Sequence, residues 1–236
     1  MRKLNKKFII DIKNEFDNIY CYVKSVTETL DAKTSIQFCD FVIDMLLKNM
    51  ESSMQLDFIQ HERNISEIYL SKKKEEINYR TFPYIPQTVK IDSENIHIET
   101  DRFVEVDLSK CYLLCNTRKT ESLIKMMKIL SKEDFLFEGN NHRAMYIEYI
   151  NTCAFLDEGV HSLSVAHYLK KGIIIAKLVD ISKIFPYVST DGLNWYINDD
   201  NYNEIAVDDF RLSLIYEIAK LKYSIAKRQC VEPQLK

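Results

Sequence analysis

One segment near the middle of the chain has residue types suited to binding a phosphate. It runs from Asp157 to Ser162, with the order Asp-Glu-Gly-Val-His-Ser. An apolar run at 153–156 predicts a buried strand before it, and a helix is expected at 161–171, with Gly172 ending it. A strand that turns through glycine into a helix directs backbone N–H groups and the positive end of the helix dipole toward one point. The pattern therefore predicts an anion pocket.

Each residue of this segment is assigned a role in the predicted pocket. His161 is expected to act either as the acid/base catalyst or as a hydrogen-bond donor to the phosphate. Asp157 or Glu158 is the expected acidic catalytic residue, which would orient His161 or hold a metal ion. Gly159 and Ser162 are expected to contact the phosphate at the helix start. No metal site with recognisable ligand spacing is present, because the C-x3-C pair at 111 and 115 has no second pair beside it.

A second turn, at 138–143, carries His142 and Arg143. These side chains are candidates for the same phosphate pocket, where Arg143 would act as a charge clamp. A strand is expected after Arg143, at 145–150, so the main motif is assigned to His161. The sequence leaves open whether the two turns meet.

The remaining pattern predicts an α+β fold. The first eighty residues show a helical period, and a period of two begins at Thr88. We expect a helical region at 1–80 and an α+β domain at 88–236 that a C-terminal helix closes. Helices are expected at 4–30, 35–49 (with Thr34 and Ser35 as caps), 53–76, 122–130 and 207–228; strands at 89–91, 96–98, 103–106, 135–137 and 173–179; and a hairpin turn at 189–195.

The segment at 155–162 resembles the ParB/sulfiredoxin-like superfamily, whose members carry a strand, an acidic-glycine turn and a His-Arg or Arg-Arg pair that opens a helix. The resemblance continues through Ala166, Leu169, Gly172 and the strand at 175–180, and covers a quarter to a third of the chain. An uncharacterised group of bacterial proteins with a Gly-x-His-Ser motif also looks similar. This chain has Ser162 where the superfamily usually has arginine, so its strongest phosphate clamp is missing.

The resemblance implies a site for a phosphate or a nucleotide, with a nucleoside triphosphate and Mg as the implied cofactor. Members of the superfamily bind CTP, hydrolyse ATP or cut DNA, and the resemblance does not select among these activities. We therefore expect a protein that binds the phosphate of a nucleotide or nucleic acid, and leave open whether it is also a nucleotide hydrolase or nuclease. The alternative is a non-enzymatic interaction protein with a degenerate site, which forms a homo-oligomer through its N-terminal helices.

Composition and missing motifs narrow the function classes. The net charge of −3, from 32 basic and 35 acidic residues, does not demand a polyanionic partner. The apolar run at 8–10 is too short for a signal peptide or a membrane span, so we expect no membrane contact. The six dispersed cysteines are typical of free thiols, so we expect a cytoplasmic protein. Motifs of P-loop ATPases, serine hydrolases, zinc proteases and Rossmann enzymes are absent.

Overall fold

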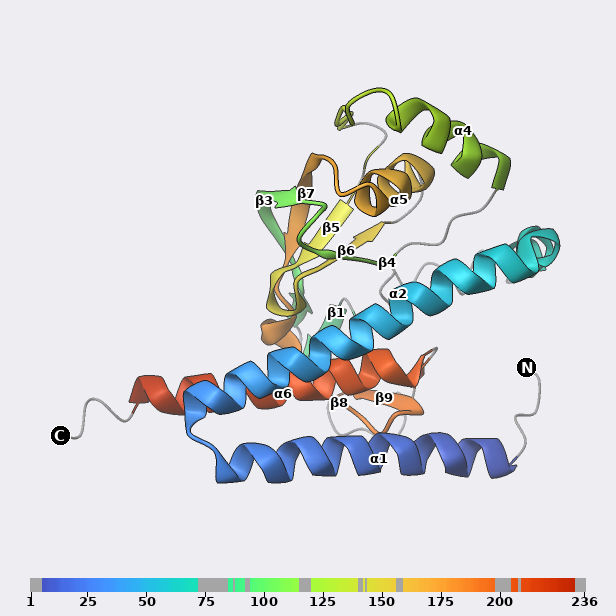
Figure 1. Cartoon of the computed structure of the whole chain (residues 1–236). Coiled ribbons are helices and arrows are strands. Elements are labelled where there is room, and N and C mark those ends of the chain that lie inside the picture. The colour runs from blue at the N-terminus through green and yellow to red at the C-terminus, as the bar shows by residue number, and fades with distance from the viewer. Residues whose placement is uncertain are drawn as a thin grey trace. The chain divides into compact units, whose positions relative to one another are not determined.

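A computed structural model of the chain describes residues 6–71, 85–86, 88–91, 94–114, 120–139, 142, 144–155, 159–197, 205–207 and 209–231. The chain divides into two compact units, each described by itself below. Unit 1 comprises residues 1–46, 84–97 and 181–236, and unit 2 comprises residues 47–83 and 98–180. Helices and mixed sheets are both present, which confirms the expected α+β class (Figure 1).

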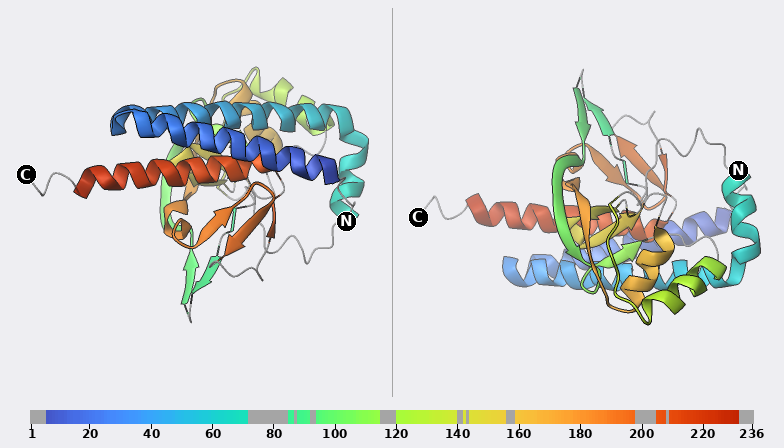
Figure 2. Two further views of the ribbon diagram at one scale, coloured as in Figure 1. Left: turned by 90° about the horizontal axis from the view of Figure 1, so that it is seen from below. Right: turned by 90° about the horizontal axis from the view of Figure 1, so that it is seen from above.

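Unit 1 is built around helices α1 (Lys6–Thr29) and α6 (Phe210–Val231), which contact each other, with the first part of α2 (Ala32–Ser71). It also contains the antiparallel hairpin of β1 (Thr88–Ile91) and β2 (Glu94–His97), and the short 3-10 helix η2 (Ile181–Ile184). A small sheet has the order β10-β9-β8, made by Ile205–Ala206, Asn194–Ile197 and Val188–Thr190. The hairpin of β8 and β9 lies beside α6 (Figure 2).

The expected turn at Asp191-Gly192 is confirmed in unit 1, and the tryptophan that follows it is buried. Asp191 accepts hydrogen bonds from the N–H groups of Leu193 and Asn194 through Oδ1, and Gly192 has φ +87°. Trp195 is 1% exposed and meets the ring of Tyr216 edge-on at 5.2 Å between centroids. The turn therefore delivers the single tryptophan to the core of this unit.

Two expectations about α2 were wrong. Asp31 caps the helix, because its Oδ1 accepts from the N–H of Thr34 at 3.1 Å, so Thr34 and Ser35 already lie inside the helix. The break expected between 49 and 53 does not occur either. No glycine or proline interrupts this stretch, and the Ser53 hydroxyl bonds back to the carbonyl of Asn49 at 2.8 Å within one continuous helix.

Unit 2 contains a five-stranded mixed sheet with the order β3-β7-β5-β6-β4. Strands β5 and β7 are parallel, as are β4 and β6, while β3 with β7 and β5 with β6 are antiparallel. The strands are β3 (Glu99–Asp107), β4 (Tyr112–Leu114), β5 (Ala144–Ile147), β6 (Thr152–Phe155) and β7 (Ile173–Val179).

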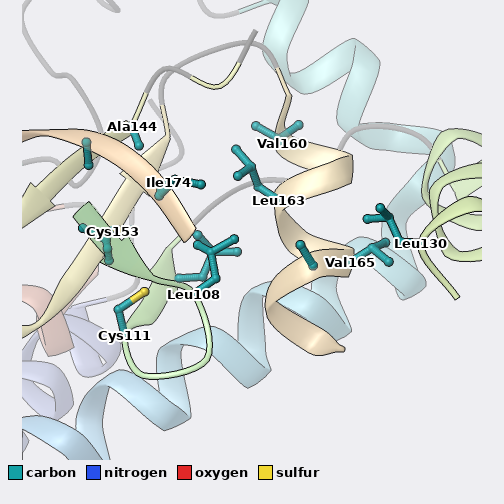
Figure 3. Packing of buried hydrophobic residues seen from close by; sticks show 13 residues of the cluster. Leu108, Cys111, Leu130, Ala144, Cys153, Val160, Leu163, Val165 and Ile174 are labelled. Carbon is teal, nitrogen blue, oxygen red and sulfur yellow. The ribbon is translucent and has the colours of Figure 1, made fainter. Parts of the chain in front are cut away.

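Helix α5 (Val160–Tyr168) packs on one face of this sheet and contacts α4 (Thr120–Leu130). Leu163 and Ala166 of α5 are fully buried in one hydrophobic cluster with the sheet residues Ile174 and Cys153. Figure 3 shows Leu163 directed toward Ile174. The hydrophobic cluster between helix and sheet fixes the position of α5, and so of its first turn.

The expected order of strand, strand, turn, helix and strand from 145 to 179 is confirmed, with three local corrections. The strand at 145–150 ends at Ile147, where a 3-10 turn begins. The strand expected at 135–137 is irregular backbone instead. Helix α5 stops before Gly172, because Lys170 adopts φ +56° and the N–H of Lys171 bonds to the carbonyl of Ala166 at 2.8 Å, which is a Schellman ending.

Among the described residues, no helix is both long enough and apolar enough to cross a membrane.

Candidate functional site

The first turn of α5, residues 159–162, is called the α5 turn below. Gly159 precedes the helix with φ +75° and ψ +1°, a left-handed conformation that glycine adopts without strain. Its carbonyl accepts the first helical hydrogen bond, from the N–H of Leu163 at 3.1 Å. Gly159 offers no capping side chain, so the N–H groups at this end depend on other partners, as at any helix start.

His142 joins the α5 turn through Ser162. The N–H of Glu138 donates to Nδ1 of His142 at 2.9 Å, so we assign the imidazole proton to Nε2. Nε2 lies 3.0 Å from Oγ of Ser162 and donates to it. The Ser162 hydroxyl in turn donates to the carbonyl of Gly159 at 2.9 Å. Four residues thus form one directional chain of hydrogen bonds that ends at the start of α5.

The chain of bonds determines what His142 can do. Burial lowers the pKa of its imidazole, although the charge of Glu138 acts in the opposite direction, so His142 is neutral at neutral pH. The rings of Phe135 and Phe137 lie at 5.1 and 5.8 Å from its own, between centroids. Because Nε2 already carries the proton, His142 cannot accept one from Ser162. His142 is a positioning residue for the serine, not a base that activates it.

The other residues expected at the pocket fall into two groups. His161 lies in the α5 turn and is partly exposed, so it can reach solvent. Asp157, Glu158 and Arg143 lie outside the described residues. The structure therefore brings His142, Gly159, His161 and Ser162 together in one region of unit 2.

A second polar cluster, which the sequence did not predict as a pair, lies at the other end of α5. His167 is buried and its Nε2 is 2.6 Å from Oε1 of Glu51, on α2. Its Nδ1 is 2.5 Å from the carbonyl oxygen of Leu108. Both neighbours are acceptors, so both ring nitrogens donate and the imidazole is charged. Burial alone would lower the pKa of His167, but the hydrogen bond and charge of Glu51 outweigh it and raise the pKa.

Two thiols lie near this cluster. Cys111 and Cys153 are 5% and 0% exposed and share a hydrogen bond. The bond from Cys153, with a smaller effect from the charge of His167, lowers the pKa of the Cys111 thiol. Cys153 is the donor, so the same bond and its burial raise its pKa well above the ordinary range. Burial keeps both thiols from solvent and gives this cluster a structural role. No group of three metal-ligating side chains occurs within the described part of the chain.

Comparison with known proteins identifies a family. A family model matches residues 2–229, so the chain belongs to DUF6710, a family of unknown function. No match was found among the curated proteins or the solved structures.

Proposed function

We propose that this DUF6710 protein binds the phosphate group of a nucleotide or nucleic acid at the α5 turn. The observation that carries the proposal is the convergence of Gly159, Ser162 and His142 on the start of α5, next to the partly exposed His161. A helix start carries about half a unit of positive charge and directs N–H groups outward, so it favours a phosphate. His161 would donate a further hydrogen bond to the ligand.

The proposed binding mode gives Ser162 and His142 distinct tasks. The hydroxyl of Ser162 is held by two hydrogen bonds, at 3.0 Å from His142 and 2.9 Å to Gly159, so its position at the turn is fixed before a ligand arrives. A fixed turn costs less to order on binding than a mobile one. Arg143 would add the guanidinium that the serine cannot supply, and Asp157 or Glu158 would hold Mg²⁺ on a nucleoside triphosphate.

We also propose that unit 2 contains a ParB/sulfiredoxin-like core. Support comes from the order β6, glycine turn, α5, β7, which follows the pattern of that superfamily, and from the glycine at the point where the helix begins. This chain has Ser162 where the superfamily usually has arginine. The missing arginine favours binding over cleavage as the first activity to test. A nuclease or nucleotide hydrolase would use His161 with Asp157 or Glu158 as acid and base.

Thermal melting with nucleoside triphosphates and Mg²⁺ tests the binding proposal. A ligand present at a hundred times its Kd should stabilise the protein by about 2.7 kcal/mol. The nucleoside without phosphate should give no shift, and His161→Ala should erase the shift. The matched control is Tyr168→Ala at the opposite end of α5, where the side chain is 66% exposed, and this variant should respond as the wild type does. Equal responses of both variants would contradict the proposal.

A second candidate function is assembly through the N-terminal helices. Large apolar side chains are exposed on α1 and α2, at Tyr22 (64%), Phe41 (57%) and Met45 (47%). Phe41 and Met45 are four residues apart and therefore share one face of α2. Sedimentation velocity tests this candidate, which predicts a dimer that the double variant Phe41→Ser/Met45→Ser converts to a monomer. A wild-type monomer at high concentration would exclude it.

A further inference from the structure

An open groove of about 610 Å³ lies along the C-terminal part of α6 in unit 1, and its volume is in the range of small-molecule sites. One wall is the segment 185–186, which follows η2, and the other wall is one face of α6. The residues of that face recur at helical steps over two turns: Lys220, Tyr223, Ser224, Lys227 and Arg228. At a rise of about 1.5 Å per residue, this lining extends about 12 Å along the helix.

The middle of the groove is apolar. Phe185 lines it but is only 2% exposed, so its ring lies at the base, with its centroid 5.4 Å from that of Tyr223. Pro186, by contrast, is exposed. Ser224 adds little polarity, because its hydroxyl already donates to the carbonyl of Lys220 at 2.9 Å. An apolar ligand would therefore displace water from this part of the groove at little cost in lost hydrogen bonds.

The positive charges of the groove lack acidic partners at one end only. At the other end, Lys220 donates to the first carbonyl of β8 at 2.8 Å and interacts electrostatically with the buried Glu217, one turn earlier. Lys227 and Arg228 are exposed, and Lys227 lies over the ring of Tyr223, 5.6 Å from its centroid. Neither cation forms an ion pair within the described part of the chain. No acidic residue is among the described residues that line the groove.

Stabilisation of the helix end does not account for these two cations. A basic side chain favours the negative end of the helix dipole within the last turn, which contains Arg228 but not Lys227. On another face of α6, Lys222 is paired with Asp40 at 2.5 Å, so a cation of this helix takes an acidic partner where one is in reach. Two cations without such a partner, next to an apolar wall, are complementary to an anion with an apolar body.

We propose that the groove binds a small organic carboxylate with an apolar chain, of the class of medium-chain fatty acids. The carboxylate accepts hydrogen bonds from Arg228 and Lys227, and the chain lies along Tyr223 toward Pro186. A guanidinium group matches a carboxylate in a bidentate pair. A nucleic acid would need cations along its whole path, whereas this groove has its unpaired cations at one end. The groove belongs to unit 1 and the α5 turn to unit 2, so the inference does not depend on phosphate binding.

Isothermal titration calorimetry of the full chain with decanoate, below its micelle concentration, tests the proposal. Decanoate should bind saturably, with one site per chain. Acetate, which has the head group alone, and decyltrimethylammonium, which has the same chain on a positive head, should give no saturable heat. The net charge of −3 favours the cationic probe, so a preference for decanoate must come from local charge. Binding of decyltrimethylammonium as strong as that of decanoate, or no binding of decanoate at millimolar concentration, would overturn the proposal.

The double variant Lys227→Gln/Arg228→Gln locates the head group. Both side chains are exposed, so the variant should fold, and it should bind decanoate about tenfold more weakly because charge-assisted hydrogen bonds are lost. Lys125→Gln/Lys128→Gln is the matched control, which removes two exposed charges from α4 in unit 2 and should leave binding unchanged. Ser224→Trp, which fills the middle of the groove, should abolish binding. Equal affinities of the two double variants, or full affinity of Ser224→Trp, would contradict the assignment of this groove.

Discussion

His142 donates a hydrogen bond from Nε2 to Oγ of Ser162 across 3.0 Å, which links an irregular segment before β5 to the first turn of α5. The N–H of Glu138 fixes the proton on Nε2 by bonding to Nδ1 at 2.9 Å. The serine is consequently an acceptor from the histidine and a donor to Gly159. This arrangement holds the helix start in one conformation, which suits binding better than nucleophilic catalysis by Ser162.

Ser162→Ala should destabilise unit 2 by about 1–3 kcal/mol, because it leaves the buried Nε2–H of His142 without its acceptor. Urea denaturation followed by circular dichroism measures the change. Ser164→Ala is the matched control on the same helix. The Ser164 hydroxyl bonds back to the carbonyl of Val160 at 2.7 Å, as the Ser162 hydroxyl does to Gly159, but Ser162 is the serine that bonds to Nε2 of His142. The loss of the Ser164 hydroxyl should change stability by no more than about 0.5 kcal/mol. Equal effects of the two substitutions would show that the bond to His142 contributes nothing.

His142 and His167 of unit 2, which are both buried, should titrate on opposite sides of the ordinary value of 6.5. Burial lowers the pKa of His142, whereas Glu51 raises that of His167 against the effect of burial. Nitrogen-15 NMR of the imidazoles should find His142 as a neutral ring protonated on Nε2 and His167 as an imidazolium at pH 6.5. A neutral His167 at that pH would contradict the assigned ion pair.

Glu51→Gln should destabilise the protein by about 2 kcal/mol near pH 6, because the charged hydrogen bond to His167 becomes a neutral one. Folding raises the pKa of His167, so its protonated form stabilises the folded state. This contribution to the free energy of unfolding is fully present below about pH 6.5 and is lost as pH rises through the folded-state pKa. The difference between wild type and variant should therefore shrink toward pH 9. A difference that stays constant or grows with pH would have the wrong sign.

Gly172→Ala should lower the free energy of unfolding by about 2–4 kcal/mol. Gly172 has φ +101°, and a Cβ there would lie 2.4 Å from Cδ1 of Phe135. Gly139→Ala is the control, because its nearest contact would be Cε1 of Phe137 at 3.8 Å, and it should change stability by less than about 0.5 kcal/mol. The comparison uses the midpoints of urea unfolding, and a tolerated Gly172→Ala would mean that Phe135 is free to move aside.

Local patterns in the sequence predicted most of the elements. The apolar stripe of α1, the Asp191-Gly192 turn and the apolar run of β7 each depend on neighbours within a few residues, and each was found. The strand expected at 135–137 was wrong because its phenylalanines pack on His142 and Gly172 instead of pairing with a strand. Alternating apolar residues cannot distinguish these two outcomes.

The site could be predicted only in part for the same reason. The glycine turn and His161 stand next to each other in sequence, so their proximity required no tertiary information. The contact of His142 with Ser162 joins two turns across β5 and β6, and the ion pair of Glu51 with His167 joins α2 to α5. Neither pair has a spacing that marks it in the sequence, because packing of α5 on the sheet brings the partners together.

The most direct test of phosphate binding is a titration of the ¹⁵N-labelled protein with inorganic pyrophosphate and then with ATP and Mg²⁺, followed through backbone amide resonances. The account predicts that the largest and saturable shifts occur at the N–H groups of Val160, His161 and Ser162, and that His161→Ala weakens them. Saturable shifts confined to other parts of the chain, or no shifts at these three amides at millimolar ligand, would contradict it.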